Sequence, residues 1–385
     1  MTRQPSIRPF YPTAATAGMV MISLGPLLDA VLRDFGADRA QGGLLSLMFF
    51  GGMCVAILAI NFVLGKLSSK ATLMLGIAAQ GLGLFLAGGA ADSLRSLTAC
   101  YALIGFGYGF PAIYPGMCVT SLIKPSAERP LGLINGFFAI GVLATPVVIG
   151  QALTRGVSWR GVLIGEGILS LVLLVYYLTT TLPDIPNRQN VRPRQLAEIR
   201  RANPRLVLVI LLALWLYVGA ENIFNVWLAK FQIDIFASRA SRAGLTVSLF
   251  WLGLTVGRFG AVRLMGRFRT TGLISAAGWL MALGIAAVSL SPWRWVSEGF
   301  CFVTGLASAA IFPLIASYVG RFPAWFSGVV FSLGYLAATV GAMFFPYLVG
   351  PAADWVGFRL AMFSAALPCA VVALLAGPLD RAAAK

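Results

Sequence analysis

The feature that most constrains this chain is a series of twelve apolar stretches, each long enough to cross a bilayer as a helix. A bilayer core about 30 Å thick requires roughly 20 apolar helical residues. Nine such stretches contain no charged residue: 9–28, 40–65, 71–91, 96–123, 130–154, 270–293, 299–320, 322–353 and 360–379. Three more, 162–182, 206–229 and 243–264, contain the ionisable residues Glu166, Glu221 and Arg258 respectively. We therefore expect an all-α membrane protein with twelve transmembrane helices.

One stretch is long enough to raise the question of two helices. The run 322–353 holds 32 residues without a charge. Proline and glycine favour turns, so Pro346 and the Gly350-Pro351 pair predict one helix that ends in a turn there.

Composition excludes several other classes of protein. Apolar residues make up 59% of the 385 residues and charged residues 11%, far from the typical 45–50% and about 25% of soluble domains. With no histidine, thirteen acidic residues and no pair of cysteines in a CxxC spacing, the chain lacks the usual materials of catalytic and metal sites. We expect no enzyme activity, no catalytic residue, no metal and no cofactor.

Charge also bears on partners and orientation. The net charge of +16 comes from basic residues scattered over short loops, which argues against a nucleic-acid groove binder. Lysine and arginine are in excess on the side of the membrane that would hold both termini, and cytoplasmic loops have this excess. We expect a multi-pass protein of the cell inner membrane, in contact with membrane lipids, with both termini cytoplasmic and a monomeric state. The loop 183–205 alone contributes six arginines: Arg188, Arg192, Arg194, Arg200, Arg201 and Arg205.

The two halves of the chain repeat each other. Ala112-Ile113-Tyr114-Pro115 matches Ala310-Ile311-Phe312-Pro313, and Gly141 matches Gly341, at shifts of 198 and 200 residues. Fixed-period similarity indicates duplication. We expect an N-terminal six-helix bundle over 1–182, a cytoplasmic linker over 183–205 and a parallel C-terminal bundle over 206–385.

This organisation resembles the major facilitator superfamily, whose fold has two pseudo-symmetric six-helix bundles. The loop Gly65-Lys66-Leu67-Ser68-Ser69-Lys70 is similar to that superfamily's signature between its second and third helices, with Ser69 in place of the usual aspartate. The resemblance implies alternating access to a substrate site between the bundles near mid-membrane.

A narrower resemblance is to the fucose:proton symporters and the related glucose/galactose transporters. It rests on Tyr217-Val218-Gly219-Ala220-Glu221, on Gly257-Arg258-Phe259 with Gly260, Leu264 and Arg267-Phe268, and on Phe49-Phe50-Gly51. The acids that the fucose symporters carry in helices one and four have no counterpart near Gly25 and Phe110.

Ionisable residues inside a bilayer are costly unless they face a partner or a wet cavity, so each is a functional candidate. Glu221 lies deep inside its span, and Tyr217, Glu221 and Asn225 share one helical face at i, i+4 and i+8, with Asn222 adjacent. A carboxylate flanked by amides and a phenol can hydrogen-bond a polyol and accept a proton. The alternative for Glu221 is a structural carboxylate paired with an arginine or a neighbouring helix.

Further candidates line the expected spans. Aromatic rings stack on sugars, although the same residues also serve packing. The substrate- or proton-binding set is Glu221, Asn222, Asn225, Tyr217, Tyr114, Tyr108, Phe110, Asn135, Trp251 and Phe312. The gating set is Arg258, Lys66, Lys70, Arg263, Arg267 and Asp29.

Four other charged residues have open or peripheral roles. Arg258 either joins Arg267 in a cytoplasmic gate or acts as counter-charge to an anionic substrate, and Asp29 could gate or couple. Glu166 and Glu298 lie near expected helix ends, and we predict solvated caps.

These observations together predict a secondary active transporter that moves a small polar solute, a sugar or sugar-like molecule, with protons as a second ligand. Two alternatives are a multidrug-type or metabolite exporter and an organic-anion carrier. A transporter-like receptor or scaffold is a fourth reading.

Overall fold

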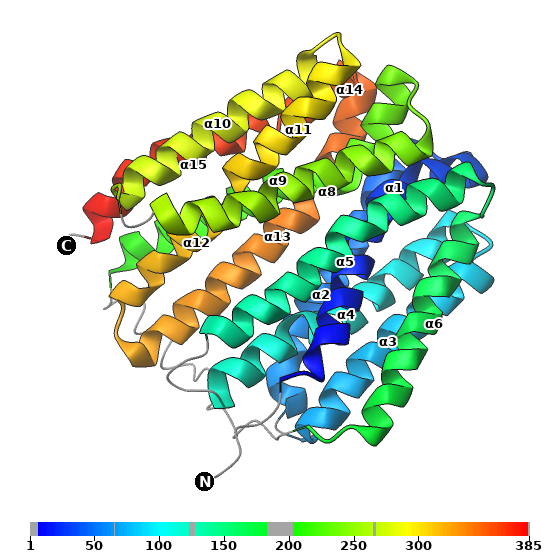
Figure 1. Ribbon diagram of the computed structural model, residues 1–385, viewed down its shortest axis with the longest axis horizontal. Helices are drawn as coiled ribbons and strands as arrows, with labels where there is room; N and C mark the ends of the chain where they lie inside the picture. The colour runs from blue at the N-terminus through cyan, green and yellow to red at the C-terminus, as the bar shows by residue number, and fades with distance from the viewer. Residues whose placement is uncertain (1–6, 65, 123–127, 183–202, 265–266, 384–385) are drawn as a thin grey trace. The chain divides into compact units, whose positions relative to one another are not determined.

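The computed structural model describes residues 7–64, 66–122, 128–182, 203–264 and 267–383, and the regular structure within them is entirely helical (Figure 1). Twelve spans in this part are long and apolar enough to cross a membrane. The predictions of an all-α membrane protein and of twelve transmembrane helices are therefore confirmed.

The chain divides into two compact units, each holding six spans. Unit 1 consists of Met1–Arg188 with Arg239–Gly244. In it α1 packs on α5, α2 on α4, and α3 on both α4 and α6. Its helices are α1 (Phe10–Phe35), α2 (Arg39–Leu64), α3 (Ser69–Gly89), α4 (Leu94–Leu122), α5 (Glu128–Thr154) and α6 (Trp159–Thr179).

Unit 2 consists of Gln189–Ser238 with Leu245–Lys385. In it α8 packs on α13 and α15, and α10 packs on α11 and α15. Its helices are α8 (Pro204–Phe236), α9 (Ala240–Leu264), α10 (Thr270–Leu290), α11 (Arg294–Ser308), α12 (Ile311–Ser317), the 3-10 turn η1 (Tyr318–Arg321), α13 (Ala324–Val356), α14 (Phe358–Phe363) and α15 (Ala366–Ala383).

The predicted linker falls mostly outside the described residues. Positions 183–202 of the 183–205 loop are not described, and this includes five of its six arginines. The three-part division into 1–182, 183–205 and 206–385 stays a prediction.

In these helices apolar side chains are exposed and polar side chains are buried, as expected for a protein surrounded by lipid. Along α6 the aliphatic side chains of Val172 and Val175 are exposed, whereas the hydroxyl of Ser170 is buried. Ser170 accepts a hydrogen bond of 3.1 Å from the amide of Gln80 on α3. Because lipid tails offer polar groups no partner, polar side chains turn inward and bond between helices.

Prolines break two of the spans that the sequence predicts as single helices. The tenth span is interrupted at Ala309-Ala310, between α11 and α12, and the twelfth at Ser364-Ala365, between α14 and α15. A proline ring clashes with the carbonyl four residues earlier. Pro313 and Pro368 lie four residues after Ala309 and Ser364.

The predicted end of the 322–353 helix is wrong. α13 continues through Pro346 and Pro351 to Val356 and ends at Gly357, whose φ of 83° suits a residue without a side chain. Prolines are tolerated in transmembrane helices because neighbouring groups compensate for the lost backbone hydrogen bond. Beside Pro346, the helix is held from α8 by Trp227, which donates to the Pro346 carbonyl at 2.7 Å.

The repeat seen in the sequence recurs in how helices approach each other. A methyl group added at Gly105 on α4 would overlap the carbonyl oxygen of Phe49 on α2. A methyl group at Gly305 on α11 would overlap the carbonyl oxygen of Phe250 on α9 in the same way. Small residues at matched positions thus permit the same close backbone contact in each unit.

We expect Gly105→Ala and Gly305→Ala each to destabilise the protein, because a backbone carbonyl cannot move aside as a side chain can. Overpacking of this kind costs about 1–3 kcal/mol. Thermal unfolding of the purified protein measures the effect. Gly165→Ala in α6 is the control, since nothing lies within 4 Å of its added methyl group. Equal unfolding temperatures for Gly105→Ala and Gly165→Ala would contradict the close contact.

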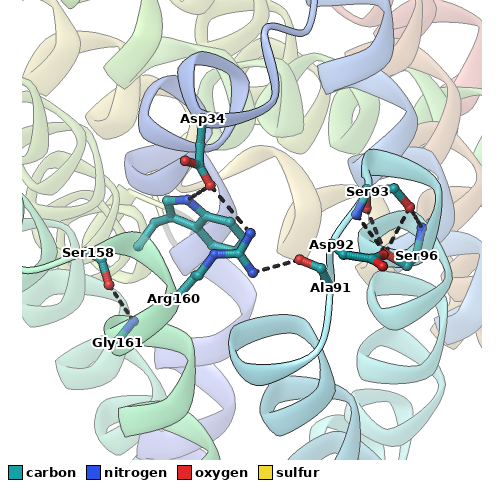
Figure 2. A network of polar contacts seen from close by, with 9 residues as sticks. Asp34, Ala91, Asp92, Ser93, Ser96, Ser158, Arg160 and Gly161 are labelled. Atoms are coloured by element: carbon teal, nitrogen blue, oxygen red, sulfur yellow. Dashed lines mark hydrogen bonds and ion pairs between the residues drawn. The ribbon is translucent and has the colours of Figure 1, made fainter.

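A polar network joins one end of α1, α3 and α6 in unit 1, as Figure 2 shows. Arg160 donates to the carbonyl of Ala91 at 2.6 Å and pairs with Asp34 at 3.4 Å. The indole of Trp159 also donates to Asp34, at 3.1 Å, and the guanidinium lies 4.4 Å from the centre of that ring. These contacts tie the helix ends together.

The expectation that Glu166 and Glu298 are solvated is wrong. Glu166 is 5% exposed and Glu298 9% exposed. α6 begins at Trp159 and α11 at Arg294, so each glutamate is at least a turn inside its helix. Packing against neighbouring helices buries both, and Glu298 lies 3.7 Å from Arg294.

Candidate functional site

The polar face that the sequence predicts belongs to α8, the 33-residue helix of unit 2. The Asn203 side chain caps its start by accepting from the Leu206 amide at 3.1 Å, and Pro204 occupies the first turn. Tyr217, Asn222 and Asn225 are buried and Glu221 is half-buried. The helix therefore presents these four side chains near its middle, among other elements of unit 2.

The hydroxyl of Tyr217 faces two acceptors. It is within hydrogen-bonding distance of the Glu221 carboxylate, one turn along the same helix, and 3.0 Å from the carbonyl oxygen of Ser308. Ser308 is the last residue of α11, directly before the break at Ala309-Ala310. A phenol has one proton, so it can donate fully to only one of these oxygens at a time.

A chain of amides extends from the same face. The indole of Trp251 on α9 donates to Asn225 at 3.0 Å, and Asn225 donates to Asn222 at 3.0 Å. Asn222 in turn donates to the carbonyl of Val218 at 2.9 Å. An amide has two donors and two acceptor lone pairs, so each asparagine keeps capacity for another partner. Such a pair suits hydroxyl groups, which both donate and accept.

Two further side chains act on Glu221 electrostatically. Arg258 on α9 interacts through space with both Glu221 and Tyr217, and its side chain is exposed. Cys369 on α15, which is buried, lies near the same carboxylate. Four helices of unit 2 therefore surround Glu221: its own, α9, α11 and α15.

The other predicted binding residues are not all part of this group. Phe312 is half-buried on α12 in unit 2. In unit 1, Tyr114 packs in an apolar core with Phe10, and Phe110 packs against α2. Tyr108 is buried with its ring 5.2 Å from that of Phe49. Asn135 on α5 is exposed.

The residues of the predicted gating set are divided between the two units: Asp29, Lys66 and Lys70 belong to unit 1, and Arg258, Arg263 and Arg267 to unit 2. Lys66, Arg263 and Arg267 are exposed in loops or at helix ends, and Gly65 of the signature loop lies outside the described residues. Lys70 donates to the carbonyl of Leu178 at 3.2 Å, in the last turn of α6. Asp29 on α1 is buried and pairs with Arg33 at 2.5 Å.

The sequence analysis missed two parts of the site. The Ser308 acceptor is a backbone atom, and Cys369 is one apolar-looking residue in an apolar run. Pro313 was a usable signal for Ser308, because a proline marks where helical carbonyls lose their partners.

The sequence profile of the Major Facilitator Superfamily matches residues 10–323. The chain belongs to this superfamily. The glucose/galactose transporter of Brucella abortus is 23% identical over 355 residues, covering 87% of this chain and 84% of that protein. The predicted resemblance to the major facilitator superfamily and to its glucose/galactose transporters is therefore confirmed.

Solved structures of other transporters share the fold. A bacterial homologue of the human lysosomal transporter Spinster, in an inward-facing and unoccupied conformation, gives a TM-score of 0.82 at 13% identity, over 98% of this chain and 96% of that one. The E. coli fucose:proton symporter gives 0.64 at 19% identity, over 96% and 98%.

These comparisons establish the general class of the protein. The chain is a multi-pass integral membrane protein of a transporter superfamily, with twelve spans in the described residues. The family and these relatives are transporters rather than enzymes.

Proposed function

We propose that the protein is a proton-coupled symporter of a neutral sugar or sugar-like solute, working by alternating access in the cell inner membrane with both termini cytoplasmic. The observation that carries the proposal is the single hydroxyl of Tyr217 between the Glu221 carboxylate and the Ser308 carbonyl. The printed name of the Brucella relative supports the sugar, and the excess of basic residues in the loops supports the orientation.

The arrangement of these acceptors ties proton binding to a helix break. When Glu221 is ionised, Tyr217 donates to the carboxylate, and the Ser308 carbonyl loses that donor. When Glu221 takes up a proton, the carboxyl group donates to the Tyr217 oxygen, and the phenol donates to Ser308. One proton thus changes which partner holds the end of α11, at the point where the span is already interrupted.

The sugar would bind the amide pair. Asn222 and Asn225 hold their orientation through Val218 and Trp251, which leaves their spare donors and acceptors preorganised for hydroxyl groups. Trp251 adds an aromatic face of the kind on which sugar rings stack. The candidates Tyr108, Tyr114, Phe110, Asn135 and Phe312 remain proposals as further wall residues.

The gating set supports a second part of the proposal, that loop contacts stabilise one conformation of the transport cycle. Lys70 bonds a carbonyl at the C-terminal end of α6, where a cation is favoured by the helix dipole. Lys66, Arg263 and Arg267 are exposed and so accessible to acidic partners. Asp29 and Arg33 form an ion pair near the C-terminal end of α1, which is a second contact of this kind.

Tyr217→Phe tests the coupling. Without the hydroxyl, Glu221 and Ser308 lose their shared partner, and a hydrogen bond to a charged group is worth about 1.5–3 kcal/mol. We expect proton-driven uptake of radiolabelled glucose or galactose into proteoliposomes to fall about tenfold or more. Tyr177→Phe, which removes a buried hydroxyl bonded to Thr13 and Pro9 in unit 1, is the control.

Two results would count against this proposal. One is a Tyr217→Phe protein with the same dependence of uptake on the pH gradient as wild type. The other is a wild-type protein that responds to neither sugar nor pH gradient.

A second candidate function, an organic-anion carrier, is favoured by Arg258. Within the described part of the chain its exposed guanidinium forms no ion pair, and it acts on Glu221 only through space. An anion could use it as counter-charge. Arg258→Gln separates the two functions: it would abolish uptake of an anion and leave uptake of a neutral sugar measurable.

A further inference from the structure

Unit 1 contains a buried carboxyl group that the proposed function does not use. Glu166 lies in α6, is 5% exposed, and neither of its carboxyl oxygens has a hydrogen-bond partner among the described residues. Seven residues separate it from Trp159 at the start of the helix, which is about 10 Å along the helix axis. Neither the snorkelling of a short side chain nor an end-cap explains a carboxyl group at this depth.

Two hydroxyl groups from other helices interact with it, those of Ser23 and Tyr101. Ser23 on α1 is close to the carboxyl group, but its hydroxyl donates to the Val20 carbonyl at 3.1 Å. Tyr101 on α4 interacts electrostatically with Glu166, and its buried hydroxyl also has no hydrogen-bond partner in the described part of the chain. Three helices therefore bring together a carboxyl group and two hydroxyls, of which three oxygen atoms are unsatisfied.

The charged groups on the surrounding helices are engaged elsewhere or lie at helix ends. On α1, Asp29 pairs with Arg33, and Asp34 pairs with Arg160 of α6. On α3, Lys70 bonds the far end of α6. Arg95 on α4 and Arg129 on α5 lie within two residues of a helix start.

The remaining titratable side chains on these helices include several tyrosines and two thiols of α4, Cys100 and Cys118. Tyr108 and Tyr114 on α4 are buried farther along that helix, and Tyr176 and Tyr177 lie near the C-terminal end of α6. Tyr177 is bonded to Thr13 and Pro9. No described residue forms an ion pair with Glu166.

A buried carboxylate without a counter-charge is far more costly than a neutral carboxyl group. A metal ion needs several oxygen ligands, and the described residues contain no group of three His, Cys, Asp or Glu side chains that could hold one. A proton needs only one donor–acceptor pair. The protonated carboxyl group can donate to Ser23 while Tyr101 donates to its other oxygen, which satisfies every unpartnered atom of the cluster.

We propose that Glu166, with Ser23 and Tyr101, is a proton-binding site of unit 1, separate from Glu221. The site holds one proton on the carboxyl group in the folded protein. It rests on the contacts within unit 1 alone and does not depend on which solute the protein transports.

Infrared spectroscopy of the full chain, purified in lipid nanodiscs without substrate, tests the site directly. A protonated carboxyl group has a carbonyl stretch that an ionised one lacks. We expect wild type to contain a component of this band that disappears as the pH is raised. Glu166→Gln should lack that component, and Glu221→Gln should retain it. Tyr101→Phe should shift its frequency, because the carbonyl oxygen loses its donor.

Two results would overturn the proposal. One is a protonated-carboxyl band that is the same in wild type and Glu166→Gln, together with an unshifted band in Tyr101→Phe. The other is loss of the Glu166 component when sodium chloride replaces choline chloride at constant pH, which would assign the site to a sodium ion. If Glu166→Gln does not fold, the frequency shift in Tyr101→Phe and the sodium comparison still decide the outcome.

Thermal unfolding supplies an independent readout. Glutamine has the shape of the protonated carboxyl group and cannot ionise. As the pH rises and the buried group of wild type must lose its proton, the unfolding temperature of wild type should fall more steeply than that of Glu166→Gln. Parallel curves would contradict a titrating group at this position.

Discussion

Glu221→Gln is expected to abolish accumulation of sugar against its gradient while preserving exchange of labelled for unlabelled sugar across the membrane. Glutamine keeps the size and polarity of the side chain but can neither take up nor release a proton. The Tyr217 hydroxyl would then remain in one arrangement, and the link between protonation and Ser308 would be lost. Uptake and counterflow in proteoliposomes, with and without an imposed pH gradient, measure the two activities separately.

Glu298→Gln is the matched control for this experiment. Glu298 is another glutamate of unit 2; it is buried and pairs with Arg294 near the start of α11. We expect its substitution to affect stability more than coupling. If Glu221→Gln still accumulates sugar when a pH gradient is imposed, Glu221 is not the coupling residue.

Asn225→Ala is expected to produce the second large effect, a loss of sugar affinity. Asn225 is the central link between Trp251 and Asn222, so its removal takes away a direct ligand and also frees both neighbours. The loss of such bonds costs about 1–3 kcal/mol. The dissociation constant should therefore rise roughly tenfold to a hundredfold, measured by isothermal titration calorimetry with glucose and galactose.

Gln232→Ala provides the comparison for Asn225→Ala. Gln232 is a buried amide on the same helix, but it donates to Ser297 at 2.8 Å in a helix contact. Its substitution should lower stability and leave the dissociation constant close to that of wild type. Equal losses of affinity in the two variants would mean that the amides of α8 act through folding and not through the sugar.

The spans were predictable because the bilayer demands one property of every one of them, a length of apolar helix. This requirement applies to each segment separately. An apolar stretch such as 71–91 or 270–293 can therefore be recognised as a span without knowledge of the helices around it. The interruptions at Ala309 and Ser364 needed the structure. Prolines at 26, 111, 115 and 146 lie inside continuous helices, and only the packing around each one decides whether the helix continues.

The candidate site divides in the same way. Helical periodicity was enough to put Tyr217, Glu221 and Asn225 on one face, because all three belong to one helix. The partners of that face come from other helices: the Ser308 carbonyl from α11, the Trp251 indole from α9 and the Cys369 thiol from α15. Trp251 was predicted as a wall residue, but its bond to Asn225 was not.

Glu166 is a residue whose burial the sequence analysis predicted wrongly. Its place near the start of the expected span 162–182 predicted a cap at a helix end, yet α6 begins at Trp159 and packs against α3 and α1. The sequence by itself determined that twelve helices would enter a bilayer, in two related halves, because hydropathy and repetition are properties of the chain alone. Only the tertiary structure decided which polar groups meet, because burial and hydrogen bonding depend on residues far apart in the chain.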